Sequence, residues 1–108
     1  MGFDEAAGAC SYFTTYSGVR LPFRLVEPIA PDQIDNRNTF IRAWFDAAGR
    51  LAGFDKLVYG EVELAHRYSY HATGRLALAE IRMVDEDAVA LAFDENGEPA
   101  SPPTVLSA

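Results

Sequence analysis

FDAAGRL at residues 45–51 decides the fold, because the same pattern returns as YHATGRL at 70–76 and as FDENGEP at 93–99. The three segments start 25 and 23 residues apart, and each follows a run of residues suited to an extended strand. Each also places a glycine where a hairpin loop with a β-bulge needs a left-handed backbone. The repeat therefore predicts units of strand, tight loop and strand along an antiparallel meander.

Five strands are predicted around these loops, with further turns at Gly60 and at Asp85-Glu86-Asp87. The acidic turn lacks the ligand spacing of a calcium loop and is interpreted as a solvated turn. The predicted strands are Thr39 to Asp46, Arg50 to Tyr59, Glu61 to Tyr70, Arg75 to Val84 and Ala88 to Phe93.

Another hairpin is predicted before the repeats. Ser11 to Tyr16 is rich in aromatic and β-branched residues, Ser17-Gly18 suits a two-residue turn, and Val19 to Val26 resumes an extended pattern. Pro22 lies inside that second strand. Because proline has no N–H group for a neighbouring strand, we expect the strand at a sheet edge.

The expected fold class is mainly β, an antiparallel meander of about six to seven strands that forms a curled sheet or an open barrel. Between Glu27 and Asn38 we expect a connecting loop, in which Pro31 opens at most one short helix. Residues 1–10 and 99–108 show no alternating pattern, so both are expected to be flexible tails around a single β domain at 11–98.

Glu61 to Tyr70 alternates most clearly and predicts one apolar face. Thr39 to Asp46 is apolar on both faces, which indicates a central strand or a second covered surface. In Arg75 to Val84 one face is wholly apolar and the other also carries Glu80 and Arg82, so the alternation does not select the core face. Either the N-terminal hairpin closes over a curled sheet, or two chains pack face to face as a homodimer. The residues expected on the apolar face are Val62, Leu64, His66, Tyr68 and Tyr70.

The repeated loops resemble the tyrosine–aspartate repeats of the RHS family, whose units read aromatic, Asp, two variable residues, Gly, Arg and Leu. FDAAGRL at 45–51 matches this form, whereas position 71 carries His and positions 98–99 carry Glu-Pro. The loss of Arg-Leu in the third copy suggests that the sheet ends there. The resemblance implies hairpin geometry and no activity.

The run from Tyr12 to Ile81 is also similar to a small bacterial family of unknown function. The similarity includes YFTTYSGV at 12–19 and VYGEVEL at 58–64. This resemblance supports the fold and implies no reaction.

Composition excludes several classes of partner. The chain has a formal charge of −7, and its nine Lys and Arg residues are scattered, so nucleic acid is not an expected partner. No apolar run approaches the roughly 20 residues of a membrane-spanning helix, and we expect no membrane role. Met1 to Cys10 lacks the features of a secretory signal, and Cys10 has no second cysteine to pair with. The cytoplasm is therefore the expected location.

His66 and His71 are the only histidines. Five residues apart, they point to opposite faces of a straight strand, so neither a metal site nor a cofactor is predicted. If the chain were an enzyme, the candidate catalytic groups would be His66, Tyr68 and Tyr59, because histidine titrates near neutrality and tyrosine can orient or protonate a substrate.

The leading functional hypothesis is a non-enzymatic cytoplasmic module that binds another protein, or itself, through an exposed sheet face or edge. A second hypothesis is a small enzyme or ligand carrier with a pocket lined by Trp44, Tyr59, His66 and Tyr68. Arg42 joins Trp44, His66 and Tyr68 as a candidate ligand-binding residue. A third hypothesis is an acidic inhibitor or immunity protein that neutralises a basic partner.

Overall fold

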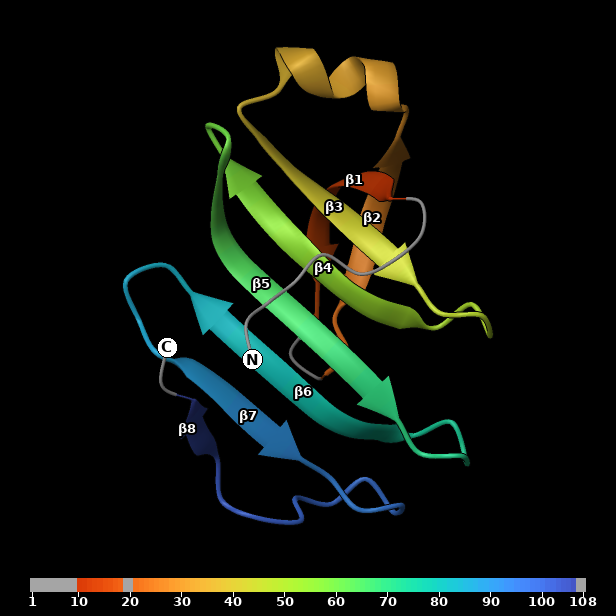
Figure 1. The fold of residues 1–108 in the computed structure, drawn as a ribbon. Helices are drawn as coiled ribbons and strands as arrows, with labels where there is room; N and C mark the ends of the chain where they lie inside the picture. The colour runs from red at the N-terminus through yellow and green to blue at the C-terminus, as the bar shows by residue number, and fades with distance from the viewer. Residues whose placement is uncertain (1–9, 19–20, 107–108) are drawn as a thin grey trace.

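The computed structural model describes residues 10–18 and 21–106, which form one eight-stranded antiparallel sheet (Figure 1). The strand order is β2-β1-β3-β4-β5-β6-β7-β8, so neighbours in sequence are neighbours in the sheet from β3 onward. The elements are β1 (Ser11–Ser17), β2 (Arg24–Ile29), the 3-10 helix η1 (Pro31–Asn36), β3 (Thr39–Phe45), β4 (Leu51–Val58), β5 (Glu61–Tyr70), β6 (Leu76–Met83), β7 (Ala88–Ala92) and β8 (Thr104–Leu106).

The prediction of a mainly β, antiparallel fold is confirmed, but the predicted number of strands is too low. The additional strand is β8, which pairs with β7 inside the segment expected to be a C-terminal tail. A bridge between Phe93 and Pro99 also carries the sheet past the third repeat, where we expected it to end. A three-residue strand next to prolines is too short to show alternation, which is why the pattern did not reveal it. The predicted N-terminal tail at 1–10 falls, apart from Cys10, outside the described residues.

The first hairpin differs from its prediction in the position of its second strand. β2 runs from Arg24 to Ile29, so Pro22 lies in the loop before it and the two-residue turn at 17–18 is wrong. The prediction that this strand lies at an edge is correct, because β2 pairs with β1 on one side and ends the sheet. It contains Pro28, which an edge strand tolerates. Within the described residues, η1 is the single short helix, and it begins at Pro31 as expected.

The three repeated loops have the same geometry. In each, the residue after the aromatic donates its N–H to the carbonyl four residues later, as Asp46 does to Arg50 at 2.9 Å and His71 to Arg75 at 2.8 Å. The glycines at 49, 74 and 97 have φ values of 83, 92 and 88°, which favour glycine. Figure 1 shows these loops side by side at one end of the sheet.

The core lies on one face of the sheet, under the β1–β2 hairpin. Phe54 is fully buried there, and the rings of Tyr16 and Phe23 from the hairpin lie 5.7 and 6.2 Å from its ring. The hairpin thus folds back over the central strands, so the sheet is curled. It is not closed, because β2 and β8 remain as separate edges.

On β5 the expected apolar face is confirmed for Leu64, His66 and Tyr68, which are all buried. Val62 departs from this pattern and is 41% exposed. The pairing of β4 and β5 shifts between Lys56 and Leu57, so the strand before Leu64 turns its side chains the other way. The shift places Val62 on the surface opposite the core.

Candidate functional site

The four side chains expected to line one pocket are dispersed, so that prediction is wrong. Tyr59 lies in the β4–β5 turn and is 76% exposed. Ala43, Phe54 and His66 are paired across β3, β4 and β5, while Trp44 belongs to the adjacent row with Gly53 and Arg67. Because side chains alternate along a strand, Trp44 points away from the face that holds His66.

His66 and Tyr68 form a buried polar pair inside the aromatic core. Nδ1 of His66 lies 2.6 Å from the Tyr68 hydroxyl, which also accepts the N–H of Phe23 at 3.2 Å. The His66 ring lies 4.8 Å from the ring of Phe23 and 4.6 Å from that of Phe54. This pair ties β5 to the loop of the first hairpin.

The charges of this pair are set by burial. Burial, and secondarily the positive charge of Arg67, lowers the pKa of His66 to about 4. Burial likewise raises the pKa of Tyr68 above its ordinary value. Both groups are therefore neutral at pH 7, and the histidine tautomer sets which of them donates the hydrogen bond between Nδ1 of His66 and the Tyr68 hydroxyl. A histidine with this pKa is poorly suited to act as a general base near neutrality.

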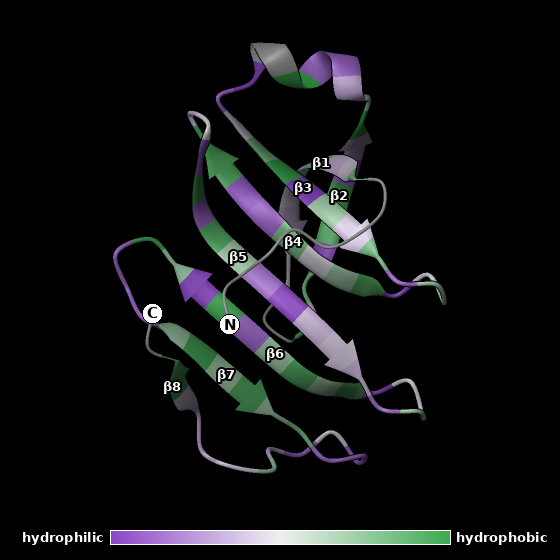
Figure 2. Cartoon of the chain, in the orientation of Figure 1, coloured by the Kyte–Doolittle hydropathy of each residue, from purple (hydrophilic) through white to green (hydrophobic). Residues whose placement is uncertain are grey.

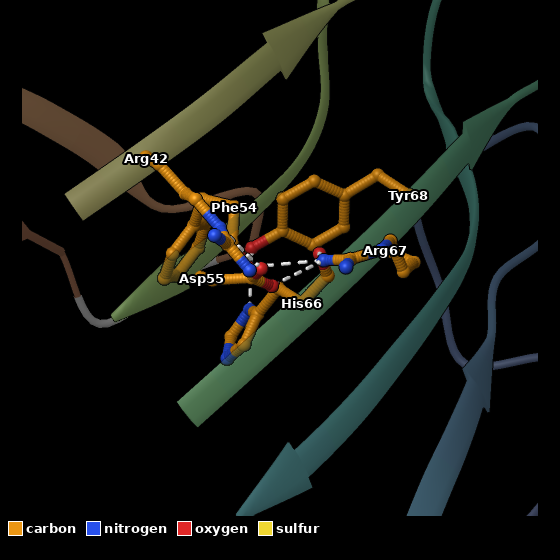
Figure 3. Close-up of polar contacts among 6 residues, drawn as sticks. All are labelled: Arg42, Phe54, Asp55, His66, Arg67 and Tyr68. Atoms are coloured by element: carbon orange, nitrogen blue, oxygen red, sulfur yellow. Dashed lines mark hydrogen bonds and ion pairs between the residues drawn. The ribbon is translucent and has the colours of Figure 1, made fainter. Parts of the chain in front are cut away.

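A second polar cluster lies on the opposite face, where Arg42 and Arg67 converge on Asp55 (Figure 3). Nε of Arg42 donates to Oδ2 of Asp55 at 3.0 Å, and Nη1 of Arg67 donates to Oδ1 at 2.9 Å. Both guanidinium groups lie over the Trp44 ring, with their central carbons 5.8 and 5.0 Å from its centroid. The candidates Arg42 and Trp44 are thus brought together, but with Asp55 and Arg67, which the sequence analysis missed.

Asp55 and Arg67 do not belong to any sequence motif that would have marked them as site residues. Asp55 is followed by Lys56 in a strand whose other residues are apolar, and the Asp55 side chain is only 4% exposed. A charged residue within an apolar strand does indicate a buried ionic partner. Its partners depend on strand register, which the sequence alone did not provide.

Gly53 makes room for the side chain of Arg67. A Cβ atom at Gly53 would lie 2.8 Å from Cδ of Arg67 and 2.8 Å from the His66 carbonyl oxygen. We therefore expect Gly53→Ala to lower the free energy of unfolding by about 1–3 kcal/mol, since the backbone or the arginine must shift. Urea unfolding measures the effect, with Ser69→Ala as an exposed control in β5. A Gly53→Ala protein as stable as that control would contradict this role of Gly53.

A groove of about 1020 Å³ extends from this cluster to the β6–β7 turn and β8. Across the sheet, Arg42, Asp55, Ala65 and Arg82 are paired in one row, so the small side chain of Ala65 separates Asp55 from Arg82. Figure 2 shows the corresponding hydrophilic segments within β3 to β6. The remaining lining residues are Val62, Arg67, Val84, Asp85, Glu86, Asp87, Val89 and Val105.

Exposed apolar side chains gather at the same end of the sheet. Among the described residues, Phe45 is the exposed large apolar side chain at the end that carries the repeated loops. The others lie on or next to the β4–β5 turn, the β6–β7 turn and β8. They are Tyr59, Val62, Met83, Val84 and Val105. We call Val62, Val84 and Val105, which also line the groove, the valine patch.

A second groove, of about 650 Å³, lies near the repeated loops and is lined in part by Tyr70, Arg75 and Phe93. Neither groove is lined by His66, Tyr68, Tyr59 or Trp44. In the described part of the chain, no three His, Cys, Asp or Glu side chains come together as metal ligands. The same residues include no helix with the length and apolarity needed to cross a membrane.

Comparison with known proteins identifies the family. A family model, described as a family of unknown function, DUF6156, matches residues 5–102. The chain belongs to DUF6156. No curated protein and no solved structure matches the chain. The family match is consistent with the expected domain of unknown function.

Proposed function

We propose that this DUF6156 protein is a non-enzymatic, cytoplasmic protein-binding module of a bacterial cell. Its binding surface is the groove with the valine patch. The observation that carries the proposal is the gathering of exposed apolar side chains at one end of the sheet, three of them in a single groove. Single exposed apolar residues are ordinary, whereas a group rimmed by polar residues is typical of an interaction site.

The sheet face is a better binding surface than either edge. The β2 edge contains Pro28, which has no N–H group, and Glu27, whose φ of 58° interrupts the extended backbone. Both features disfavour pairing with a further strand. The β8 edge is three residues long, which offers few backbone groups to a partner strand.

The titratable groups favour binding over catalysis. His66 and Tyr68 are neutral and packed among aromatic rings, so they hold the hairpin in place. The acidic inhibitor hypothesis remains open as one form of protein binding, because the exposed Asp85-Glu86-Asp87 turn would attract a basic partner.

Site-specific photo-crosslinking tests the proposal. A photo-crosslinking phenylalanine analogue is placed at position 84 or at position 105 in cells that make the protein. The matched control carries the same analogue at position 45, which is exposed but at the opposite end of the sheet. We expect discrete crosslinked protein products from positions 84 and 105 and none from position 45.

The result that overturns the proposal is equally specific. Absence of a discrete product from both valine positions, in protein shown to be folded by circular dichroism, would rule out the valine patch as a protein-binding surface. Products of the same size and yield from position 45 would show random collision and would also reject it.

A further inference from the structure

We propose that the groove binds a second copy of this chain across a two-fold axis. This inference rests on the proposed protein-binding function and names the partner. The evidence for it is the distribution of charge around the groove. This distribution is complementary to that of a second copy of the chain.

Among the described residues, the lining of the groove is nearly balanced in charge, although the chain carries −7. Three arginines and four carboxylates belong to this described lining, so its net charge is −1. The charges also lie on different elements of the groove. Asp85, Glu86 and Asp87 occupy the β6–β7 turn, whereas Arg82 stands within the groove on β6 and the Arg42–Asp55–Arg67 cluster lies beyond Ala65.

The apolar residues lie beside the boundary between the two charged regions. Val84 immediately precedes the acidic turn and is 51% exposed, and Val105 on β8 is 59% exposed. The N–H of Val84 donates to the carbonyl of Glu63 at 2.9 Å, which holds this residue next to Val62 at the start of β5. The groove therefore has an acidic side and an arginine side, with the valine patch beside them.

A two-fold axis makes each contact twice, from residue i to residue j and from j to i. A patch with opposite charges on its two sides is complementary to its own rotated copy. Figure 1 shows the β6–β7 turn standing clear of the other elements, so it can reach the groove of a partner. The acidic turn of each copy then faces Arg82 of the other, and the valines meet near the axis.

A uniformly basic partner fits this groove less well than a second copy. Its cations would meet the acidic turn but also Arg42, Arg67 and Arg82, and like charges at an interface are unfavourable. The acidic residues Asp94, Glu95 and Glu98, which add to the overall negative charge, lie at the opposite end of the sheet. Their repulsion is weakened at physiological salt, where the screening length is about 8 Å.

Light scattering over a dilution series at about 0.15 M salt tests the inference. We expect the unmodified protein to form a concentration-dependent dimer. Arg82→Glu and Glu86→Arg should each weaken self-association by about tenfold or more, because each places like charges in both symmetric contacts. An equimolar mixture of the two variants should regain dimers, since the mixed pair has opposite charges at both contacts.

The matched controls are Arg75→Glu and Glu95→Arg, which make the same charge changes near the repeated loops. We expect both controls to dimerise like the unmodified protein. Circular dichroism and urea unfolding establish that all four variants are folded.

Two results would overturn the inference. One is a monomer at every concentration, and the other is a mixture that associates no better than each variant alone. If either occurs while position 84 still crosslinks to a different protein, the protein-binding function stands and self-association is rejected. If the crosslinks also disappear, both proposals fail.

Discussion

Asp55→Ala should lower the free energy of unfolding by about 3–5 kcal/mol, because it removes the carboxylate to which two arginines are bound. Asp55 is 2% exposed, and it accepts hydrogen bonds from Nε of Arg42 and Nη1 of Arg67. The side chains of Arg42 and Arg67 are only 26 and 17% exposed, so their charges are held close together with limited access to water. Without Asp55 both arginines lose a charge-assisted hydrogen bond in a poorly solvated site.

Urea unfolding at pH 7 measures this effect, with the transition slope used to check that the unfolded state is unchanged. Glu95→Ala is the control, because it removes an exposed carboxylate near the repeated loops and should alter stability by no more than about 0.5 kcal/mol. Asp55→Asn should fall between the two, since it keeps the shape and loses the charge. An Asp55→Ala protein as stable as the Glu95→Ala control would show that the cluster does not stabilise the sheet.

The local features of the fold were predictable because they depend on neighbouring residues. The loops at 45–51 and 70–76 require a left-handed glycine, and a left-handed glycine leaves a visible signal at each repeat. The apolar face of β5 was visible for a related reason, since Leu64, His66 and Tyr68 alternate without interruption. Both predictions needed no knowledge of the neighbouring strands.

Features that depend on strand pairing were not predictable. Val62 is exposed because the pairing of β4 with β5 shifts at Lys56. The strand β8 forms because three residues pair with the edge of β7. Neither effect leaves an alternating pattern in the sequence. The strand count and the extent of the C-terminal tail were therefore predicted wrongly, as were the turn of the first hairpin and the start of β2.

The prediction of the candidate site was wrong for the same reason, because it also depended on strand pairing. Sequence patterns assigned Trp44 and His66 to one pocket on the basis of residue type, yet the pairing of β3 with β4 and of β4 with β5 puts them on opposite faces. The Arg42–Asp55 contact joins residues that are 13 apart in sequence, and it requires their direct pairing across two strands. Residue type was enough to recognise the candidate residues. Their contact partners could be identified only once the register of the strands was known.

The two polar clusters are linked through adjacent residues of β5. His66 faces the core and Arg67 faces the groove, and the Arg67 charge contributes to the low pKa of His66. Nη1 of Arg67 also donates to the His66 carbonyl at 2.9 Å and to that of Phe54 at 3.2 Å. One short segment therefore fixes both the packing of the hairpin and one wall of the groove.

Acidification from pH 7 to pH 4 should remove about 2–3 kcal/mol of stability through His66 alone. The pKa of this imidazole is lowered from 6.5 to about 4 in the native protein. Below about pH 6.5 the unfolded chain binds a proton that the native chain does not, so acid favours unfolding until the native histidine is also protonated near pH 4. Each pKa unit corresponds to about 1.4 kcal/mol, and residual solvent access reduces the total slightly.

Urea unfolding at several values between pH 7 and pH 4 measures the effect. His66→Gln should be less stable than the unmodified protein at pH 7, because it loses the contacts of the imidazole with Phe23 and Phe54. Its disadvantage should shrink by about 2–3 kcal/mol at pH 4, since glutamine does not titrate while carboxylate effects are common to both proteins. Ser69→Ala is the control, because it changes an exposed residue of β5 and leaves both histidines in place, and it should follow the pH profile of the unmodified protein. A constant difference between His66→Gln and the unmodified protein across this range would mean that His66 is not kept neutral by its burial.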